Sequence, residues 1–360
     1  MDLMQVEALG DLLASETEAQ RSQALKQMRG DFAARYDSWR ERLVRVLAHV
    51  EAVIDFAEDE ADVVESSVLS EVVPLLARVH WEVQNVLGDT KRGQIIRDGF
   101  GVAIVGVPNA GKSSLLNALS DREQAIVSDI PGTTRDLVQV SLNIGGYPVT
   151  VTDTAGIRDD AVDEIEKVGI SRAVRSCENA DLRLLVVDAV SVHEQHHDGV
   201  ADWRPTASRC VRSGPTIVLL NKVDALTEDA IKRVESRVRS HFDEKEMQEV
   251  QSRPKELLHV SCTANIGLEA IVVRVRDSLQ AILKGDGTFS SDIITRERHR
   301  EHLRACEAHL ELTKALLDKG EVVIAAEELR LAVEELASIV GRVDVEDLLD
   351  VVFQDFCIGK

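Results

Sequence analysis

The chain has 360 residues, enough for about two domains with their own cores. Its formal net charge of −21 argues against loose, charge-driven binding of nucleic acid, because phosphate backbones reward clustered Lys and Arg. Five scattered cysteines without C-x-x-C spacing argue against a disulfide framework and a cysteine zinc site, and no apolar run is long enough for a membrane span.

The first quarter of the chain has helical periodicity. Apolar residues recur in steps of three and four from about Leu25 to Val53, which predicts one long amphipathic helix. A second stripe of the same kind runs from Val68 to Gly88. The short acidic link Glu58–Asp62 between the stripes favours an antiparallel pair of helices.

After Gly99 the pattern changes to short β-type runs that alternate with helical ones. This alternation predicts a mainly parallel sheet covered by helices, with ligands at the carboxyl ends of the strands. A glycine pair, Gly145-Gly146, predicts one antiparallel hairpin. The segment from Val190 to Pro215 lacks periodicity, and we expect irregular structure there. The predicted strands are Phe100–Val105, Val138–Ile144, Val149–Thr152, Leu182–Val187, Thr216–Leu220 and Leu257–Val260.

Helical periodicity returns after Gly287, with stripes from Leu303 to Leu317 and from Ile324 to Val340. The helices on each side of the α/β region are too few for a core of their own. We infer that residues 1–97 and 286–360 form one helical domain, into which an α/β domain at residues 98–285 is inserted.

A phosphate-binding loop is predicted where the first strand ends. Gly106 to Ser113 matches G-x-x-x-x-G-K-[ST], with a strand before it and a helix after it. Glycines let successive backbone N–H groups face phosphate oxygens, and the helix N-terminus adds partial positive charge. We expect Lys112 to reach the β- and γ-phosphates and the Ser113 hydroxyl to ligate Mg²⁺. The nucleotide contacts expected here are Asn109, Ala110, Gly111, Lys112, Ser113 and Ser114.

Two later segments predict guanine as the base. Asn221-Lys222-Val223-Asp224 directly follows the strand that ends at Leu220. A carboxylate accepts the two N–H donors of guanine and is mismatched to adenine, so Asp224 favours GTP or GDP over ATP. Ser261, Cys262 and Thr263 follow the last strand and are placed to close over the same base.

Two further segments are candidate switches. Asp153 begins an Asp-Thr-Ala-Gly run after a strand, which places a carboxylate near Mg²⁺ and the Gly156 N–H near the γ-phosphate. Thr133 and Thr134 lie in the loop before the second strand, where a threonine hydroxyl completes the Mg²⁺ shell only while the γ-phosphate is present. Ile157 stands where many small GTPases carry a water-orienting glutamine. An isoleucine cannot hold water, so another group must.

In combination these motifs resemble the bacterial and organellar tRNA-modification GTPase family called MnmE or TrmE. The resemblance covers nearly the whole chain and includes Asp129–Asp136 and the terminal Cys357-Ile358-Gly359-Lys360. It implies a Ras-like P-loop GTPase domain inserted in an all-α helical domain. It also implies GTP hydrolysis in the modification of the wobble uridine, U34, of tRNA, together with a flavin-dependent partner (MnmG, also called GidA). The implied compartment is bacterial cytoplasm or mitochondrial matrix.

The resemblance further implies that two G domains dimerise across their switches when K⁺ is bound, which activates hydrolysis. Besides Lys112 and Thr134, the catalytic candidate is the acidic residue that orients water, which matches Glu166, with Glu164 as the alternative. The implied K⁺ ligands are Asn109, Ser128, Ile130 and Thr133.

Three questions stay open at this point. Cys357 is either a small buried hydrophobe or a reactive thiol near the modification site. The family's N-terminal folate-binding domain has no counterpart, because Met1–Gln5 matches the segment where the helical domain begins; folate is expected only if the full protein carries that domain. The alternative function is a regulatory GTPase switch for ribosome assembly or another RNA-linked process.

Overall fold

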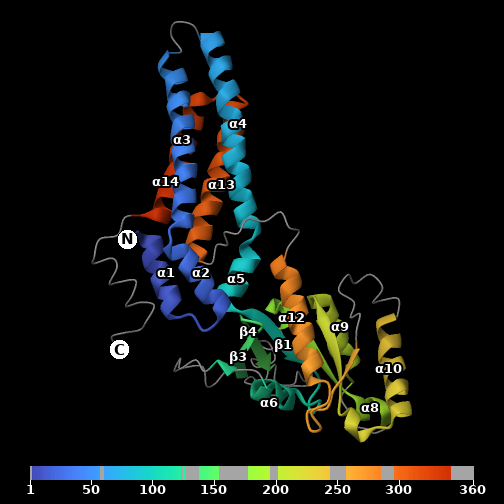
Figure 1. Cartoon of the computed structure of the whole chain (residues 1–360). Helices are drawn as coiled ribbons and strands as arrows, with labels where there is room; N and C mark the ends of the chain where they lie inside the picture. The colour runs from blue at the N-terminus through green and yellow to red at the C-terminus, as the bar shows by residue number, and fades with distance from the viewer. Residues whose placement is uncertain are drawn as a thin grey trace, which may run out of the picture. The chain divides into compact units, whose positions relative to one another are not determined.

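A computed structural model describes residues 2–56, 61–122, 125–126, 138–153, 177–194, 202–243, 257–284 and 296–341 (Figure 1). The chain divides into two compact units. We call Met1–Arg97 with Gly285–Lys360 the helical unit, and Asp98–Lys284 the α/β unit. The helical unit is therefore built from two segments that are distant in sequence.

The helical unit is a bundle whose core draws on both segments. Helix α3 packs against α4 and α14, and α13 packs against α14 and α4 (Figure 1). Trp39 and Leu43 of α3 are fully buried in a core that α13 and α14 complete. The helices are α1 (Leu3–Leu13), α2 (Glu18–Met28), α3 (Asp31–Phe56), α4 (Ala61–Gly88), α5 (Thr90–Asp98), α13 (Glu297–Leu317) and α14 (Val322–Val340).

The single helix predicted from Leu25 onward is wrong at its beginning, because α2 ends at Met28 and α3 starts at Asp31. Gly30 between them has a φ of +85°, a left-handed conformation that interrupts a helix and suits glycine. Asp2 caps the start of the earlier helix α1, and its carboxylate accepts a hydrogen bond from the Gln5 backbone N–H at 2.7 Å.

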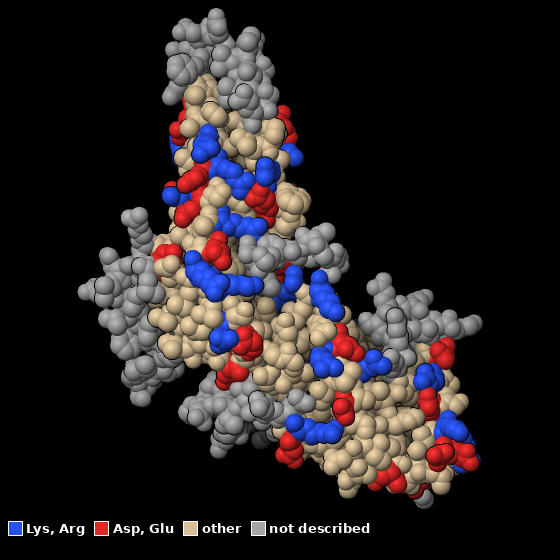
Figure 2. Space-filling view, viewed as in Figure 1, with Lys and Arg blue, Asp and Glu red and all other residues tan. Residues whose placement is uncertain are grey.

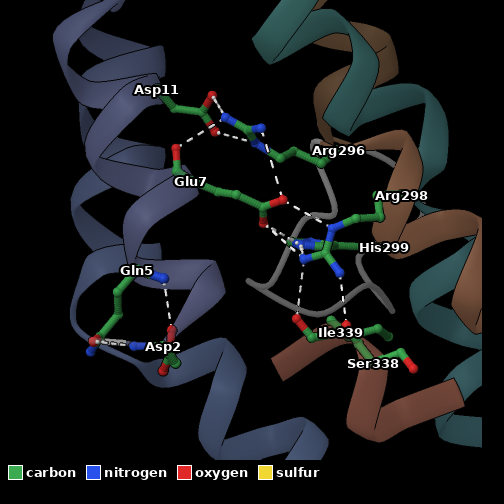
Figure 3. Close-up of polar contacts among 9 residues, drawn as sticks. All are labelled: Asp2, Gln5, Glu7, Asp11, Arg296, Arg298, His299, Ser338 and Ile339. Carbon is green, nitrogen blue, oxygen red and sulfur yellow. Dashed lines mark hydrogen bonds and ion pairs between the residues drawn. The ribbon is translucent and has the colours of Figure 1, made fainter. Parts of the chain in front are cut away.

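A buried polar group joins the two segments of the helical unit (Figure 3). We call Glu7, Asp11, Arg296, Arg298 and His299 the α1 cluster. Glu7 accepts hydrogen bonds from Arg298 Nε at 3.0 Å and from His299 Nε2 at 2.8 Å. Arg296 Nη2 donates to Asp11 at 2.7 Å, and Arg298 Nη1 donates to the last turns of α14 at the Ser338 carbonyl, 2.8 Å away. The cluster thereby fastens α1 to α13 and α14.

The α/β unit contains a seven-stranded sheet in the order β2-β3-β4-β1-β5-β6-β7. Strands β4, β1, β5, β6 and β7 are parallel neighbours, whereas β2–β3 and β3–β4 are antiparallel. The hairpin predicted at Gly145-Gly146 is confirmed, since Ile144 pairs with Tyr147. The strands are β1 (Phe100–Val105), β2 (Ala125–Ile126), β3 (Val138–Ile144), β4 (Tyr147–Asp153), β5 (Leu182–Asp188), β6 (Thr216–Asn221) and β7 (Leu257–His259).

Helices cover this sheet, and every residue of the central strand β5 is buried. The expectation of irregular structure between Val190 and Pro215 is wrong, because α8 and α9 lie there. The fold class predicted from the sequence, a parallel sheet with covering helices inserted in an all-α frame, is confirmed. The remaining elements are α6 (Lys112–Arg122), α8 (Ala189–Glu194), α9 (Arg204–Ser213), η1 (Val223–Ala225), α10 (Glu228–Asp243) and α12 (Leu268–Lys284). Of the helices in the described part of the chain, none has both the length and the apolar character to cross a membrane.

Candidate nucleotide site

The phosphate loop connects the carboxyl end of β1 to the start of α6. Gly106 lies so close to β5 that a Cβ atom there would be 2.5 Å from the Val186 carbonyl oxygen. Gly111 has a φ of +99°, and a Cβ there would lie 2.2 Å from Asn221 Nδ2. Side chains are therefore excluded at both glycines, and the backbone of the loop forms the surface that a phosphate group would meet.

Lys112 is only 6% exposed, and its Nζ donates a hydrogen bond to the Val107 carbonyl at 3.0 Å. Burial lowers the pKa of this ammonium group, and the neighbouring Asp153 carboxylate opposes the shift. Burying the Lys112 ammonium group removes most of its hydration, and one backbone acceptor replaces this only in part. A bound anion would stabilise the charge further.

Ser113 and Asp153 meet where α6 begins and β4 ends. The Ser113 hydroxyl donates to Asp153 Oδ2 at 2.7 Å. The other oxygen, Oδ1, is buried and has no hydrogen-bond partner among the described residues. Hydroxyl and carboxylate oxygens are the ligands that Mg²⁺ takes in proteins, so this pair fits that ion.

The segment Asn221–Asp224, called the base-reading segment because the sequence predicts that it reads guanine, begins at the carboxyl end of β6 and is bonded directly to the phosphate loop. Asn221 Nδ2 donates to the Ala110 carbonyl at 2.8 Å, and Cys262 Sγ lies 3.7 Å from Asn221 Oδ1. Asn221 is 3% exposed, so its amide is fixed in place. Asn221 therefore stabilises the phosphate loop through the Ala110 carbonyl, and a bound base would contact the residues beside Asn221.

Lys222 has a φ of +66°, and its side chain turns back toward the phosphate loop. Its Nζ donates to the Asn109 carbonyl at 2.9 Å and to Asp188 Oδ2 at 2.6 Å. Asn109 also has a positive φ, +63°. Asp188 was absent from the sequence prediction, and the only signal for it is a polar residue at the carboxyl end of a buried strand.

The segment after β7 lies beside Asn221. Ser261 is fully buried, and its hydroxyl accepts a hydrogen bond from the Ala264 backbone N–H at 3.0 Å, which shapes the turn that contains Cys262 and Thr263. Burial, reinforced by the Asp224 carboxylate, raises the pKa of the Cys262 thiol. Asp224 itself is exposed. The structure thus brings the phosphate-loop residues, Asp153 and both base segments together at one end of the sheet.

Several predicted site residues lie outside the described residues, and their placement is not part of the geometry above. The Mg²⁺ and γ-phosphate candidates in this group are Thr134 and Gly156, the K⁺ candidates are Ser128, Ile130 and Thr133, and the water-orienting candidates are Glu164 and Glu166. Cys357, the candidate modification-site residue, also lies outside the described residues.

Comparison with known proteins identifies relatives along the whole chain. The MnmE helical domain family matches residues 3–357. The chain is 40% identical over 364 residues to "5-taurinomethyluridine-[tRNA] synthase subunit GTPB3, mitochondrial" of Danio rerio, covering 100% of this chain and 70% of that protein. It is 43% identical over 365 residues to "tRNA modification GTPase MnmE" of Parvibaculum lavamentivorans, covering 100% of this chain and 73% of the relative.

A solved structure of Era in complex with MgGDPNP and nucleotides 1506–1542 of 16S ribosomal RNA is 27% identical, with a TM-score of 0.38. It covers 58% of this chain and 65% of that one. The full-length matches carry the assignment, since each spans both segments of the helical unit and the α/β unit between them. The chain belongs to the MnmE family of tRNA-modification GTPases.

Proposed function

We propose that this chain, a GTPase of the MnmE family, uses GTP hydrolysis to drive modification of the wobble uridine of tRNA. The observation that carries the proposal is the direct bonding of the base-reading segment to the phosphate loop, from Asn221 to the Ala110 carbonyl and from Lys222 to the Asn109 carbonyl. One site thereby offers both base selection and phosphate binding. The tRNA assignment is supported by the names of the relatives that match the whole of this chain.

The phosphate end of GTP is proposed to lie on the backbone of the loop. Lys112 leaves the Val107 carbonyl to bind the β- and γ-phosphates, where its positive charge neutralises charge that develops on the leaving group. The Ser113 and Thr134 hydroxyls and the Asp153 carboxylate would hold Mg²⁺ beside the phosphates. When bound, Mg²⁺ stabilises negative charge on the phosphate oxygens. The backbone N–H groups of Gly156 and Ser114 are proposed as further phosphate contacts.

The base end of GTP is proposed to be read by side-chain and backbone groups together. Asp224 accepts the two guanine N–H donors, and backbone N–H groups of Cys262 and Thr263 approach the guanine carbonyl. Asn221 acts mainly by bracing the Ala110 carbonyl. The aliphatic stem of Lys222 is proposed to lie along one face of the purine, with its Nζ on the Asn109 carbonyl.

Activation is proposed to need K⁺ and a second copy of the chain, as the family resemblance implies. Asn109, Ser128, Ile130 and Thr133 would hold the cation, which supplies positive charge near the β–γ bridge as an arginine finger does elsewhere. Glu166, or its alternative Glu164, would orient the attacking water, because Ile157 has no polar group for this task.

Contact with tRNA is proposed to be shared with the flavin-dependent partner. On the face shown in Figure 2, Lys and Arg side chains are interspersed with Asp and Glu, and the described residues there form no broad basic patch. This mixed surface and the net charge of −21 favour a tRNA surface completed by another protein. Folate is proposed as a ligand only if the full protein carries the family's N-terminal folate-binding domain. The relatives are compatible with bacterial cytoplasm or mitochondrial matrix as the compartment.

Phosphate release measured with GTP and with ATP, each in K⁺ and in Na⁺ buffer, tests the proposal. We expect hydrolysis of GTP alone, faster in K⁺, and loss of the K⁺ advantage in Asn109→Ala. Equal rates in the two buffers would remove the cation-activated mechanism. Affinity capture tests the pathway: recovery of a flavoprotein and tRNA supports it, and recovery of ribosomal subunits alone favours a regulatory switch.

A further inference from the structure

Asp188 ends strand β5 and lies in the site, although it belongs to none of the nucleotide motifs. Its two carboxylate oxygens have different partners. Oδ1 accepts hydrogen bonds from the backbone N–H groups of Val190 at 3.0 Å and Ser191 at 3.2 Å, at the start of α8. Oδ2 accepts the hydrogen bond from Lys222 Nζ at 2.6 Å. The side chain is 11% exposed, so its position is fixed by these contacts.

Lys222, the partner of Asp188, has an unusual backbone conformation, and so has Asn109, the residue to which it donates. Asn109, Lys222 and Asn265 are the non-glycine residues with positive φ in the described part of the chain. Two of them meet directly, since Lys222 Nζ donates to the Asn109 carbonyl at 2.9 Å. Left-handed backbone at residues with a Cβ persists where surrounding contacts enforce it, and such positions cluster at ligand-binding sites.

We propose that Asp188 is a positioning residue for guanine-nucleotide binding. Its carboxylate holds the Lys222 ammonium group on the Asn109 carbonyl, and this contact keeps the base-reading segment and the phosphate loop in the spacing that a bound nucleotide needs. The inference rests on the proposed function of the site. It adds a residue that touches neither the base nor a phosphate, and it acts through Lys222.

The two oxygens of Asp188 allow the positioning role to be separated from a structural one. Capping the start of α8 needs an oxygen acceptor, which asparagine or serine also provides. Holding an ammonium group at 2.6 Å needs the negative charge. Asp188→Asn therefore keeps the volume of the side chain and one oxygen for the cap, and it replaces the oxygen that faces Lys222 with an NH2 group that cannot accept the hydrogen bond of the ammonium group.

The test measures GDP affinity and release with a fluorescent guanine nucleotide, together with the KM and kcat of GTP hydrolysis. In Asp188→Asn we expect GDP to bind about five- to tenfold more weakly, because a charge-assisted hydrogen bond to a partly exposed lysine is lost. Faster release should account for most of this change. The KM for GTP should rise by a similar factor, while kcat at saturating GTP stays within about twofold.

A double-mutant cycle with Lys222→Met tests whether Asp188 acts on GDP affinity through Lys222. Once Lys222 is absent, Asp188→Asn should change GDP affinity by less than about twofold, since the two residues act as one unit. The matched control is Asp181→Asn, at the residue before β5, whose Oδ2 accepts a hydrogen bond from the Gly101 backbone N–H at 2.9 Å. This control makes the same substitution beside the opposite end of the same strand, and its GDP affinity should equal that of the wild type.

If Asp188→Asn fails to fold, Asp188→Ser carries the test, since a serine hydroxyl caps α8 but is too short to reach Lys222. Unchanged GDP affinity in a folded Asp188 variant, or additive effects in the cycle, would overturn the positioning role while leaving the proposed GTPase function intact. A wild-type protein that binds no guanine nucleotide would overturn both.

Discussion

Two groups of buried charges in this protein, the α1 cluster and the charges at the phosphate loop, differ in how completely their polar atoms are bonded. In the α1 cluster of the helical unit, Glu7 is bonded to Arg298 and His299, and Arg296 is bonded to Asp11 (Figure 3). At the phosphate loop, Lys112 has one backbone acceptor and Asp153 Oδ1 has none among the described residues. We infer that the α1 cluster holds helices together, and that the incompletely bonded groups at the phosphate loop favour a ligand.

The largest expected effect tests the incompletely bonded group. Lys112→Met keeps the apolar stem and removes the ammonium group, so we expect GTP hydrolysis to fall by on the order of 100-fold or more. The melting temperature of the nucleotide-free protein should not fall, because burial already disfavours this charge. Phosphate release and thermal unfolding measure the two effects. A clear loss of nucleotide-free stability would place Lys112 with the structural charges instead.

The reverse pattern is expected for the fully bonded cluster. Glu7→Gln leaves Arg298 without its carboxylate partner, whereas Arg296 keeps Asp11, and the loss should cost about 3 kcal/mol of unfolding free energy in the helical unit. In a Trp203→Phe background, fluorescence reports only Trp39 and Trp81 of the helical unit, so urea unfolding can be followed there. GDP affinity should be unchanged, and the exposed control Glu18→Gln should unfold as the wild type does.

Acid should weaken the same cluster over a defined pH range. Burial raises the pKa of Glu7, but hydrogen bonds from His299 and Arg298 outweigh it and lower the value to about 2. Because the folded-state pKa lies below the ordinary 4.5, this stabilisation is full above pH 4.5 and is lost as the pH falls toward 2. Burial also lowers the pKa of His299, so stability declines as the pH falls below 6.5. Glu7→Gln should show a flatter unfolding profile below pH 4.5.

A smaller effect is expected for Asp153→Asn, which keeps the shape of the side chain and removes the charge beside Ser113. We expect the Mg²⁺ concentration for half-maximal GTP hydrolysis to rise about tenfold, since a charged carboxylate attracts Mg²⁺ more strongly than a neutral amide does. A Mg²⁺ titration of phosphate release measures this. An unchanged Mg²⁺ requirement would contradict the assignment of Asp153 to the metal.

The smallest expected effect is that of Cys262→Ala. The thiol lies 3.7 Å from Asn221 Oδ1, a weak contact, and the proposed base contact at this position is the backbone N–H. GDP affinity should therefore change by less than about twofold in an equilibrium titration. A tenfold loss would mean that the thiol itself, and not the backbone, contributes to base binding.

The structure brings together the described residues of the nucleotide motifs, whereas it differs from the sequence prediction in some of the surrounding helices. The phosphate loop, Asp153 and Asn221 carry their spacing in the sequence, and the structure brings them together. Helix α9 was missed because only three small or medium residues, Ala207, Cys210 and Val211, form its buried face. These residues have the spacing of one helical face, but the polar residues between them make the segment resemble a loop.

Contacts between distant segments could not be predicted in the same way. The pairing of Asp188 with Lys222 joins the ends of two adjacent parallel strands, and no local pattern reveals which polar residues meet there. Glu7 and His299 are separated by most of the chain, and each reads as an ordinary polar residue on an amphipathic helix. Only the packing of α1 against the late helices gives these residues their role.

The divided helical unit also has a consequence for synthesis on the ribosome. Roughly 200 residues separate α5 from α13, so at about 5–20 residues per second the early helices wait on the order of 10–40 s for their late partners. During that time α3 lacks the cover that α14 later provides to the shared apolar core. The α/β unit can therefore fold first, while the core of the helical unit is completed last.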